Sequence, residues 1–339
     1  MKKLLIISLL GVLVSPVWGA DKTDLIWKDG KWVRRAAPAE GTPAGEAALI
    51  RRKIDQKKYA SAVKSVKKFL KRYPASPLAE EVLSLAGEAE LGRKRYWQAY
   101  EWYERQLAES PGGEYFERAL DKEMEIAEAF LAGRKRIALG VFRLPAKQEG
   151  IDILQGIAET APSSPQAESA LLRIGEYYFD KGKWRLSADA YENFLTLMPK
   201  SPRAPQAELA LAEALLRSYR GPSWDETPLI EAQQRYKAFA ASYPAMALKA
   251  QVGNVLKEIR SCRAEKQYEN GRFYLRTKKP EAAAHHFRLI IEKYSDTEWA
   301  EQARVELTKL SRTAKPSGKT EEKPEGETKP VDAKKENKS

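Results

Sequence analysis

Apolar side chains recur at helical spacing in two blocks near the middle of this 339-residue chain, between residues 167 and 202. The blocks hold Leu171, Ile174 and Tyr178, and then Trp184, Tyr191 and Phe194. A turn signal, Lys181-Gly182-Lys183, separates them, and Pro199 ends the second because proline lacks an N–H and clashes with the preceding helical turn. The pattern predicts two helices joined by a tight turn, in a unit of about 34 residues.

This unit has the length and the spacing of a tetratricopeptide repeat. Gly175 falls where the two helices touch, and Ser187 falls where a small residue is needed because the backbones approach closely. The same frame predicts five further copies, marked by Tyr59, Ala62, Val66, Phe69 and Pro74; by Gly87, Tyr96, Ala99, Tyr103 and Pro111; by Gly150, Leu154, Ile157 and Pro162; by Leu229, Ala232, Tyr236, Phe239 and Pro244; and by Gly271, Tyr274, Ala283, Phe287, Ile290 and Ser295. An irregular helical bundle is the alternative, but a bundle does not need a fixed repeat period.

The predicted fold class is all-α: a tetratricopeptide-repeat solenoid of about six helix-turn-helix repeats with a C-terminal capping helix. The repeats are expected over residues 44–312, and the cap over Glu298–Ser311. Two insertions, Arg134–Ala146 and Gly221–Pro228, lengthen the third and fifth repeats. Insertions in solenoids are expected in loops on one face, where they often serve binding.

The two ends of the chain differ from the repeats. Residues 1–19 have a basic start and an apolar run too short to span a bilayer comfortably, which is typical of a secretory signal peptide. Residues 20–43 are predicted to be an N-terminal segment and linker, in which Trp27–Trp32 resembles a tight hairpin. Its tryptophans would either pack on the first repeat or be contacted by a partner protein. Residues 313–339 are rich in Lys, Glu and Pro and are expected to be disordered, as a solvated tail or a tether.

The signal predicts an exported, periplasmic protein, cleaved after Gly19 or one residue later. Because no cysteine lies near that point, we expect no lipid and at most peripheral contact with the outer membrane. In a cytosolic protein the net charge of +12 would favour binding to nucleic acid. For an exported protein we expect weak attraction to anionic surfaces of the cell envelope and no nucleic-acid partner. The single cysteine, Cys262, is expected to be a buried small apolar residue.

Candidate catalytic groups are sparse. His285 and His286 are neighbours whose side chains point about 100° apart on a helix, so they cannot chelate one metal as an i, i+4 pair can. Carboxylates such as Asp121, Glu123 and Glu125 alternate with lysine, as on a solvated face. Without a nucleophile motif or a phosphate loop we expect no enzyme, cofactor, metal site or small-molecule substrate; a hydrolase of envelope substrates is the minority hypothesis.

A resemblance rests on three joints between repeats, Tyr73–Pro77, Ala161–Pro165 and Met198–Pro202, and on the Trp224–Pro228 loop and the closing segment Val255–Asp296. Together they resemble the BamD (YfiO) type of outer-membrane assembly protein. The resemblance implies an adaptor of the machine that inserts β-barrel proteins into the outer membrane. Its C-terminal repeats would dock on the periplasmic domains of the barrel insertase, and its N-terminal repeats would receive unfolded barrel proteins. That family normally carries an N-terminal lipid on cysteine and five repeats, and this chain departs from both.

The repeat frame also predicts a partner-binding surface. Its concave positions on the first helix of the sixth repeat are Glu265, Tyr268, Arg272, Leu275 and Arg276. Arg272 and Arg276 are four residues apart, so they can present paired donors to a carboxylate, or else simply solvate the helix.

The loop residues Trp224, Asp225 and Glu226 form a second candidate for partner binding. The expected function is that of a periplasmic, non-enzymatic scaffold in assembly of outer-membrane β-barrel proteins. The alternative is a tetratricopeptide adaptor for cell-wall synthesis or division.

Overall fold

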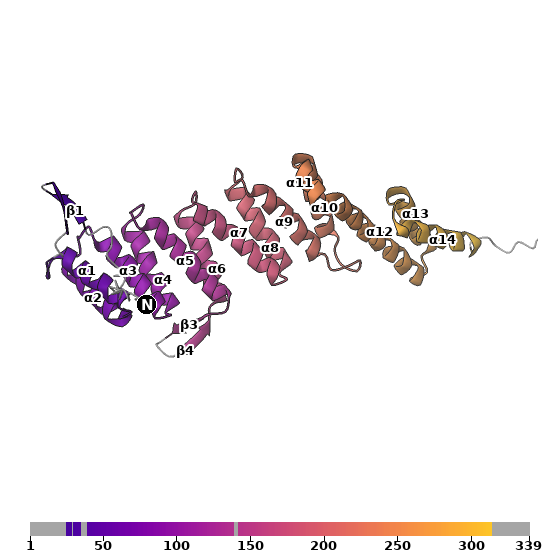
Figure 1. The fold of residues 1–339 in the computed structure, drawn as a ribbon. Coiled ribbons are helices and arrows are strands. Elements are labelled where there is room, and N and C mark those ends of the chain that lie inside the picture. The colour runs from indigo at the N-terminus through magenta and orange to yellow at the C-terminus, as the bar shows by residue number, and fades with distance from the viewer. Residues whose placement is uncertain (1–24, 29, 35–38, 139–141, 314–339) are drawn as a thin grey trace, which may run out of the picture. The chain divides into compact units, whose positions relative to one another are not determined.

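The computed structural model describes residues 25–28, 30–34, 39–138 and 142–313, drawn in colour in Figure 1. The predicted signal peptide and all but the first residue of the predicted tail lie outside these residues. The elements are β1 (Leu25–Lys28), β2 (Lys31–Arg34), α1 (Pro43–Asp55), α2 (Tyr59–Arg72), α3 (Ala79–Gly92), α4 (Tyr96–Glu109), α5 (Phe116–Leu131), β3 (Lys135–Ala138), β4 (Phe142–Pro145), α6 (Lys147–Thr160), α7 (Pro165–Asp180), α8 (Trp184–Leu197), α9 (Ala204–Ser218), α10 (Thr227–Ser242), α11 (Pro244–Lys249), α12 (Val252–Arg276), α13 (Pro280–Lys293) and α14 (Glu298–Thr313).

The helices pair as the repeat frame predicts, so the all-α tetratricopeptide fold is confirmed. The pairs are α1–α2, α3–α4, α5–α6, α7–α8, α9–α10 and α12–α13. The short helix α11 lies between the fifth and sixth pairs, and α14 follows the sixth pair. The chain divides into two compact units, residues 1–170 and 171–339. In the first unit each helix from α1 to α6 packs against the next, and in the second the same holds for α8 to α10 and for α12 to α14.

Glycine lets the two helices of a repeat approach closely. A Cβ atom built on Gly175 would lie 2.7 Å from Cε1 of Tyr191, and one on Gly87 would lie 2.4 Å from Cζ of Tyr103. Ser187, which is fully buried, donates a hydrogen bond of 2.9 Å to the carbonyl oxygen of Gly175. The predicted roles of Gly175 and Ser187 as contact residues are therefore confirmed.

The two repeats with insertions have Gly133 at φ 98° and Gly221 at φ 115° after their first helices, and the four short turns within repeats also contain a residue with positive φ. Lys57, Lys94 and Lys278 have φ values of 56°, 58° and 58°, and Gly182 has 66°. At each short turn the next residue donates its backbone N–H to a carbonyl in the last turn of the preceding helix, for example Lys279 to Tyr274 at 2.9 Å. This arrangement satisfies carbonyls that the helix end leaves free.

The last helix closes the hydrophobic core of the second unit. Trp299, Ala303, Leu307 and Leu310 of α14 all belong to the cluster built around Phe287 and Ile290 of α13, as the amphipathic pattern predicts. The cap is needed because a terminal repeat otherwise leaves one core face in water.

Both hairpins add β structure to the helical fold. The insertion at residues 134–146 contains the antiparallel pair β3–β4 and is not the plain loop that was expected. The predicted N-terminal hairpin is present as β1–β2, with Gly30 at φ 76° in its turn and Trp27 opposite Trp32 in register. Where the two tryptophan side chains pack lies outside the described part of the chain.

Two sequence expectations about single residues are wrong. Glu123 is not on a solvated face: only 1% of it is exposed, because it lies on the buried side of α5 with Ala119, Ile126 and Ala127. Cys262 is half-buried and not fully enclosed. The expectation for Glu123 failed because charge alternation along a helix does not reveal which side the neighbouring helices cover.

Candidate functional site

The candidate partner-binding surface is centred on α12, a helix of 25 residues in the second unit. It packs against α10, α13 and α14, and Arg263 and Lys266, near its middle, contact the loop that precedes α10. From Lys266 to Arg276 the helix rises about 15 Å. The loop that carries Trp224 is thus held near the middle of α12, whereas Arg276 lies at its C-terminal end. The predicted site residues are spread along the helix and do not form one compact cluster.

The loop between α9 and α10 is held to α12 by two basic side chains. The Lys266 ammonium group donates hydrogen bonds to the backbone carbonyls of Trp224 and, at 3.1 Å, Pro222. The Arg263 guanidinium lies 3.7 Å from the Glu226 carboxylate and donates to Gln233 of α10 at 2.8 Å. These bonds give the loop a defined conformation although it has no regular secondary structure.

Trp224 and Asp225 lie at the end of this loop, just before α10, and have different roles. Trp224 is 55% exposed, with the Arg220 guanidinium 5.2 Å from its ring centroid. Asp225 accepts hydrogen bonds from the N–H and the hydroxyl of Thr227, and these bonds lower the pKa of its carboxyl group. Asp225 therefore fixes the turn that leads into α10, and Trp224 presents an exposed aromatic surface from a loop that α12 holds in place.

Glu265 lies beside a half-buried phenol and thiol. Burial raises the pKa of Tyr219 to about 12, and the charge of Glu265 adds to this effect. Burial, with Glu258 and Glu265 nearby, also raises the pKa of the Cys262 thiol. Glu265 thus acts on Tyr219 through its charge, because the phenol hydroxyl has no hydrogen-bond partner among the described residues.

Tyr268 and Leu275 make contacts within the chain. The ring of Tyr268 lies 5.5 Å from Phe287 of α13 and 5.3 Å from Trp299 of α14, measured between ring centroids. Leu275 packs against the same core cluster. The aromatic and the aliphatic member of the predicted surface therefore already stabilise the last repeat and its cap.

The C-terminal half of α12 presents its charged members to solvent. Arg272 is 54% exposed and lies 3.3 Å from Glu269, and Arg276 is exposed. Phe273 is 52% exposed and lies between them in sequence. Glu269, Arg272, Phe273 and Arg276 are spaced i, i+3, i+4 and i+7, so they share one face of the helix, which we call the α12 face.

Sequence reasoning missed three residues of this surface. Arg263 and Lys266 hold the loop, and nothing in the local pattern links them to a segment some 40 residues earlier. Phe273 has a local signal, because it lies four residues after Glu269 and three before Arg276. The repeat frame assigned that position to neither the core nor the concave side.

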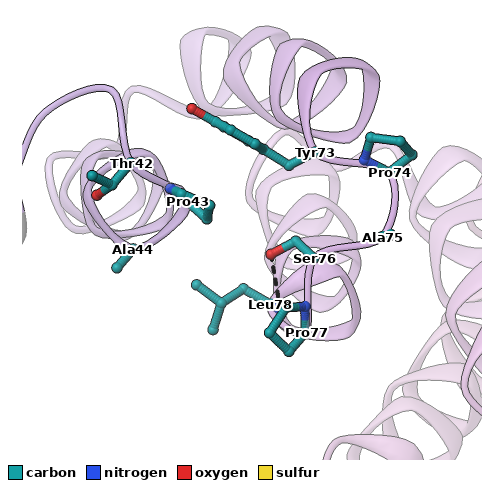
Figure 2. Close-up of a pocket in the computed structure, with 9 residues that line it drawn as sticks. All are labelled: Thr42, Pro43, Ala44, Tyr73, Pro74, Ala75, Ser76, Pro77 and Leu78. Atoms are coloured by element: carbon teal, nitrogen blue, oxygen red, sulfur yellow. Dashed lines mark hydrogen bonds between the residues drawn. The ribbon is translucent and has the colours of Figure 1, made fainter.

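The first unit carries an apolar pocket of about 570 Å3 beside its first repeat (Figure 2). It lies between the start of α1 and the joint from Tyr73 to Leu78, and the Leu78 side chain points toward its interior. The joint is fixed by two hydrogen bonds, from the Leu78 N–H to Ser76 at 3.2 Å and from the Tyr73 hydroxyl to the Gly41 carbonyl at 2.6 Å. No charged side chain lines the pocket, so it suits an apolar group.

The histidines differ from each other in environment. His285 is exposed, whereas His286 is half-buried, stacks on Tyr274 with ring centroids 5.3 Å apart, and contacts Gln267 through Nδ1 at 2.9 Å. Within the described ranges, no group of three or more His, Cys, Asp or Glu side chains is arranged to hold a metal ion. None of the helices there has the length and apolar character that crossing a membrane requires.

The family described as YfiO, outer membrane lipoprotein, matches residues 140–323, which is more than half of the chain. The chain belongs to this family. The match includes α12 and the loop that α12 holds, and its repeats make the protein a protein-interaction scaffold of the tetratricopeptide type. No curated protein matches the chain.

Solved tetratricopeptide proteins are similar to this chain at low sequence identity. A protein from Parabacteroides merdae is 15% identical, with 80% of this chain and 98% of that one covered and a TM-score of 0.32. The C-terminal part of a repeat protein from Cytophaga hutchinsonii is 13% identical, with coverages of 78% and 88% and a TM-score of 0.35. A thermophilic protein from Thermus thermophilus is 18% identical, with coverages of 63% and 99% and a TM-score of 0.28.

Proposed function

We propose that this protein is a periplasmic scaffold in the assembly of outer-membrane β-barrel proteins. The observation that carries the proposal is the YfiO family match over residues 140–323, which includes every residue of the candidate surface. The family is described as an outer membrane lipoprotein, and the joints and the closing segment of this chain resemble its assembly adaptors. The proposed partners are the periplasmic domains of the barrel insertase and unfolded barrel proteins.

The α12 face supplies the physical basis for docking. Two exposed guanidinium groups lie one helical turn apart, and an exposed phenylalanine lies between them. Arginine and large aromatic residues concentrate binding energy in interfaces. A partner segment with acidic residues on either side of an apolar one would pair with Arg272 and Arg276 and cover Phe273.

Trp224 extends this surface toward the N-terminal end of α12. The loop already has its conformation, because Lys266 and Arg263 hold it, so a partner would not have to order it on binding. Preorganisation of this kind lowers the entropic cost of association. We therefore place the loop at the edge of the docking surface and the α12 face at its centre.

The test is capture of partners from solubilised cell envelope by the purified protein. The double variant Arg272→Glu and Arg276→Glu should recover much less barrel insertase than the wild type, with unchanged helical circular dichroism, because both side chains are exposed. The matched control is Lys64→Glu and Lys68→Glu, which reverses two exposed charges at the same spacing on α2 and should leave capture unchanged.

Two outcomes would oppose the proposal. Recovery of insertase at the wild-type yield by the Arg272 and Arg276 variant would move the docking site away from the α12 face. Recovery of cell-wall synthases or division proteins in place of insertase would reject the assembly role and favour the alternative adaptor function.

A further inference from the structure

The hairpin β3–β4 extends away from the helices of the first unit (Figure 1). A two-stranded hairpin is marginally stable on its own in water, so it needs an anchor. Arg136 provides one: its guanidinium lies 3.9 Å from the centroid of the Trp97 ring on α4 and 3.7 Å from the Glu149 carboxylate on α6. The hairpin is therefore fixed at its base through one side chain.

Two apolar side chains of β4 lie on the same face of the hairpin as Arg136, which is opposite Leu144 in register, and both stay largely in solvent. Phe142 is 59% exposed and Leu144 is 47% exposed. They are two residues apart on one strand, so they point to the same face of the hairpin. Single exposed apolar residues are ordinary, but two on one side of a projecting hairpin form a surface that water does not favour.

A basic pocket lies on the other side of the hairpin. Ile137 and Arg143 are opposite each other in register and face this pocket, which has a volume of about 410 Å3. The turn between α3 and α4 forms its far wall. The polar side chains that line it are those of Arg93, Lys94, Tyr96, Arg134, Lys135 and Arg143, and none of the lining residues is acidic.

Most of this positive charge is not neutralised within the protein. Arg93 is paired with Glu90 at 2.9 Å. In the part of the chain that the structure describes, Lys94, Arg134, Lys135 and Arg143 form no ion pair with a carboxylate, and all four are exposed. Four like charges around one hollow repel each other, and an anion in the hollow would relieve that repulsion.

We propose that the β3–β4 hairpin and its basic pocket are a membrane-contact site that binds the phosphate headgroup of an anionic lipid. The pocket takes the headgroup, while Phe142 and Leu144 insert among the adjacent acyl chains. Lysine and arginine stems are long enough to leave the charged ends at the headgroup level while the apolar residues lie deeper. Basic and apolar side chains on one projecting element are the combination that binds anionic bilayer surfaces.

An acidic peptide is the competing occupant of the pocket, but it explains only half of the geometry. It would satisfy the four cations and leave Phe142 and Leu144 in water. A lipid surface satisfies both, because a hairpin that enters it meets lipid on both faces, with headgroup phosphates at the pocket and acyl chains at Phe142 and Leu144. The site does not depend on the proposed role in barrel assembly, since lipid binding requires no partner protein.

The experiment is co-sedimentation of the purified protein with vesicles. One set contains equal parts of phosphatidylglycerol and phosphatidylethanolamine, and the other contains phosphatidylcholine alone. Binding is expected to the anionic set only, and it should weaken as salt concentration rises. Changing Arg134, Lys135 and Arg143 to Gln should weaken binding by about fivefold for each charge removed.

A second variant, Phe142→Ser with Leu144→Ser, should weaken binding by about tenfold or more. Its control is Leu186→Ser with Leu197→Ser, which changes two leucines of α8 that are 46% and 59% exposed. The control should bind like the wild type. Thermal unfolding by circular dichroism should be unchanged in all variants, because every altered side chain is exposed.

Several results would overturn the proposal. These are no binding to anionic vesicles, equal binding to both vesicle sets, or anionic binding that neither hairpin variant reduces, which would reflect only the net charge of the chain. Tighter binding to a glutamate-rich peptide than to vesicles would assign the pocket to a protein partner. Saturation by free inorganic phosphate without vesicle binding would assign it to a soluble anion.

Discussion

At the scale of single residues, the fold depends on glycines at the points where two helices meet, because a side chain there would collide with the neighbouring helix. Gly175 of α7 lies against the Tyr191 ring of α8, and the same arrangement recurs as Gly271 against Phe287. Gly156 of α6 has no atom within 4 Å of the position that a Cβ would take. The two kinds of glycine look alike in sequence and differ only in what lies above them.

Gly175→Leu should lower the free energy of unfolding by roughly 1–3 kcal/mol, because the added side chain must displace the Tyr191 ring. Gly156→Leu should be neutral, or stabilise by up to about 1 kcal/mol, since leucine favours a helix more than glycine does. Urea unfolding of both variants measures the difference. Equal effects would mean that close helix contact does not explain Gly175.

Glu123 shows how burial changes the chemistry of one carboxyl group. Burial raises its pKa to about 9, and neighbouring Glu104 adds to the increase through its charge and a hydrogen bond. One of its oxygens, Oε1, is buried without a hydrogen-bond partner in the described residues. The folded protein therefore holds Glu123 as a neutral acid at neutral pH.

This carboxyl should make stability fall as pH rises from about 4.5 to about 9. In that window the unfolded chain releases the proton and the folded chain keeps it, at a cost on the order of 1 kcal/mol per pH unit. Glu123→Gln should remove this slope, as shown by urea unfolding at pH 5 and pH 8. Glu125→Gln is the exposed control and should keep it; a slope unchanged in Glu123→Gln would contradict the assignment.

At the scale of elements, the turn between the two helices of a repeat sets how they pair. In the four short turns of this kind, glycine occupies the left-handed position once, at Gly182, and lysine occupies it three times. A non-glycine residue there brings its Cβ close to the following carbonyl oxygen. The backbone hydrogen bonds of the turn nevertheless hold Lys278 in that conformation.

Lys278→Gly should raise the free energy of unfolding by about 1 kcal/mol, because it relieves this steric cost in the last repeat. The reciprocal change, Gly182→Lys, should lower it by a similar amount. Thermal unfolding of both variants tests the pair. Opposite signs are required, and destabilisation by Lys278→Gly would show that the lysine side chain contributes more than its backbone strain costs.

At the scale of the whole molecule, each unit must close its own core. The second unit does so with α14, whose Ala300 and Ala303 are buried and whose Trp299 contacts Tyr268 of α12. The same contacts occupy Tyr268 and Leu275, which the repeat frame places on a partner-binding side. Closing the core thus uses part of the predicted surface and leaves the α12 face exposed.

Removal of residues 297–339 should destabilise the second unit by roughly 3–6 kcal/mol, because it exposes the apolar cluster that α14 covers. Removal of residues 314–339 alone should leave the urea midpoint unchanged, since that segment has few apolar residues to bury. Fluorescence and circular dichroism during urea unfolding report both effects. Similar midpoints for the two truncations would refute the capping role of α14.

The sequence alone determined the elements that depend on local pattern. The repeat period, the contact glycine Gly175 and the amphipathic cap are readable because helices require apolar residues at fixed spacing and prolines end them. Long-range contacts are not encoded in spacing. Only the tertiary structure buried Glu123, turned Tyr268 inward against Trp299, and brought Lys266 to the loop at Trp224. It also placed Arg143 beside Lys94, because a basic pocket forms from segments that lie apart in the chain.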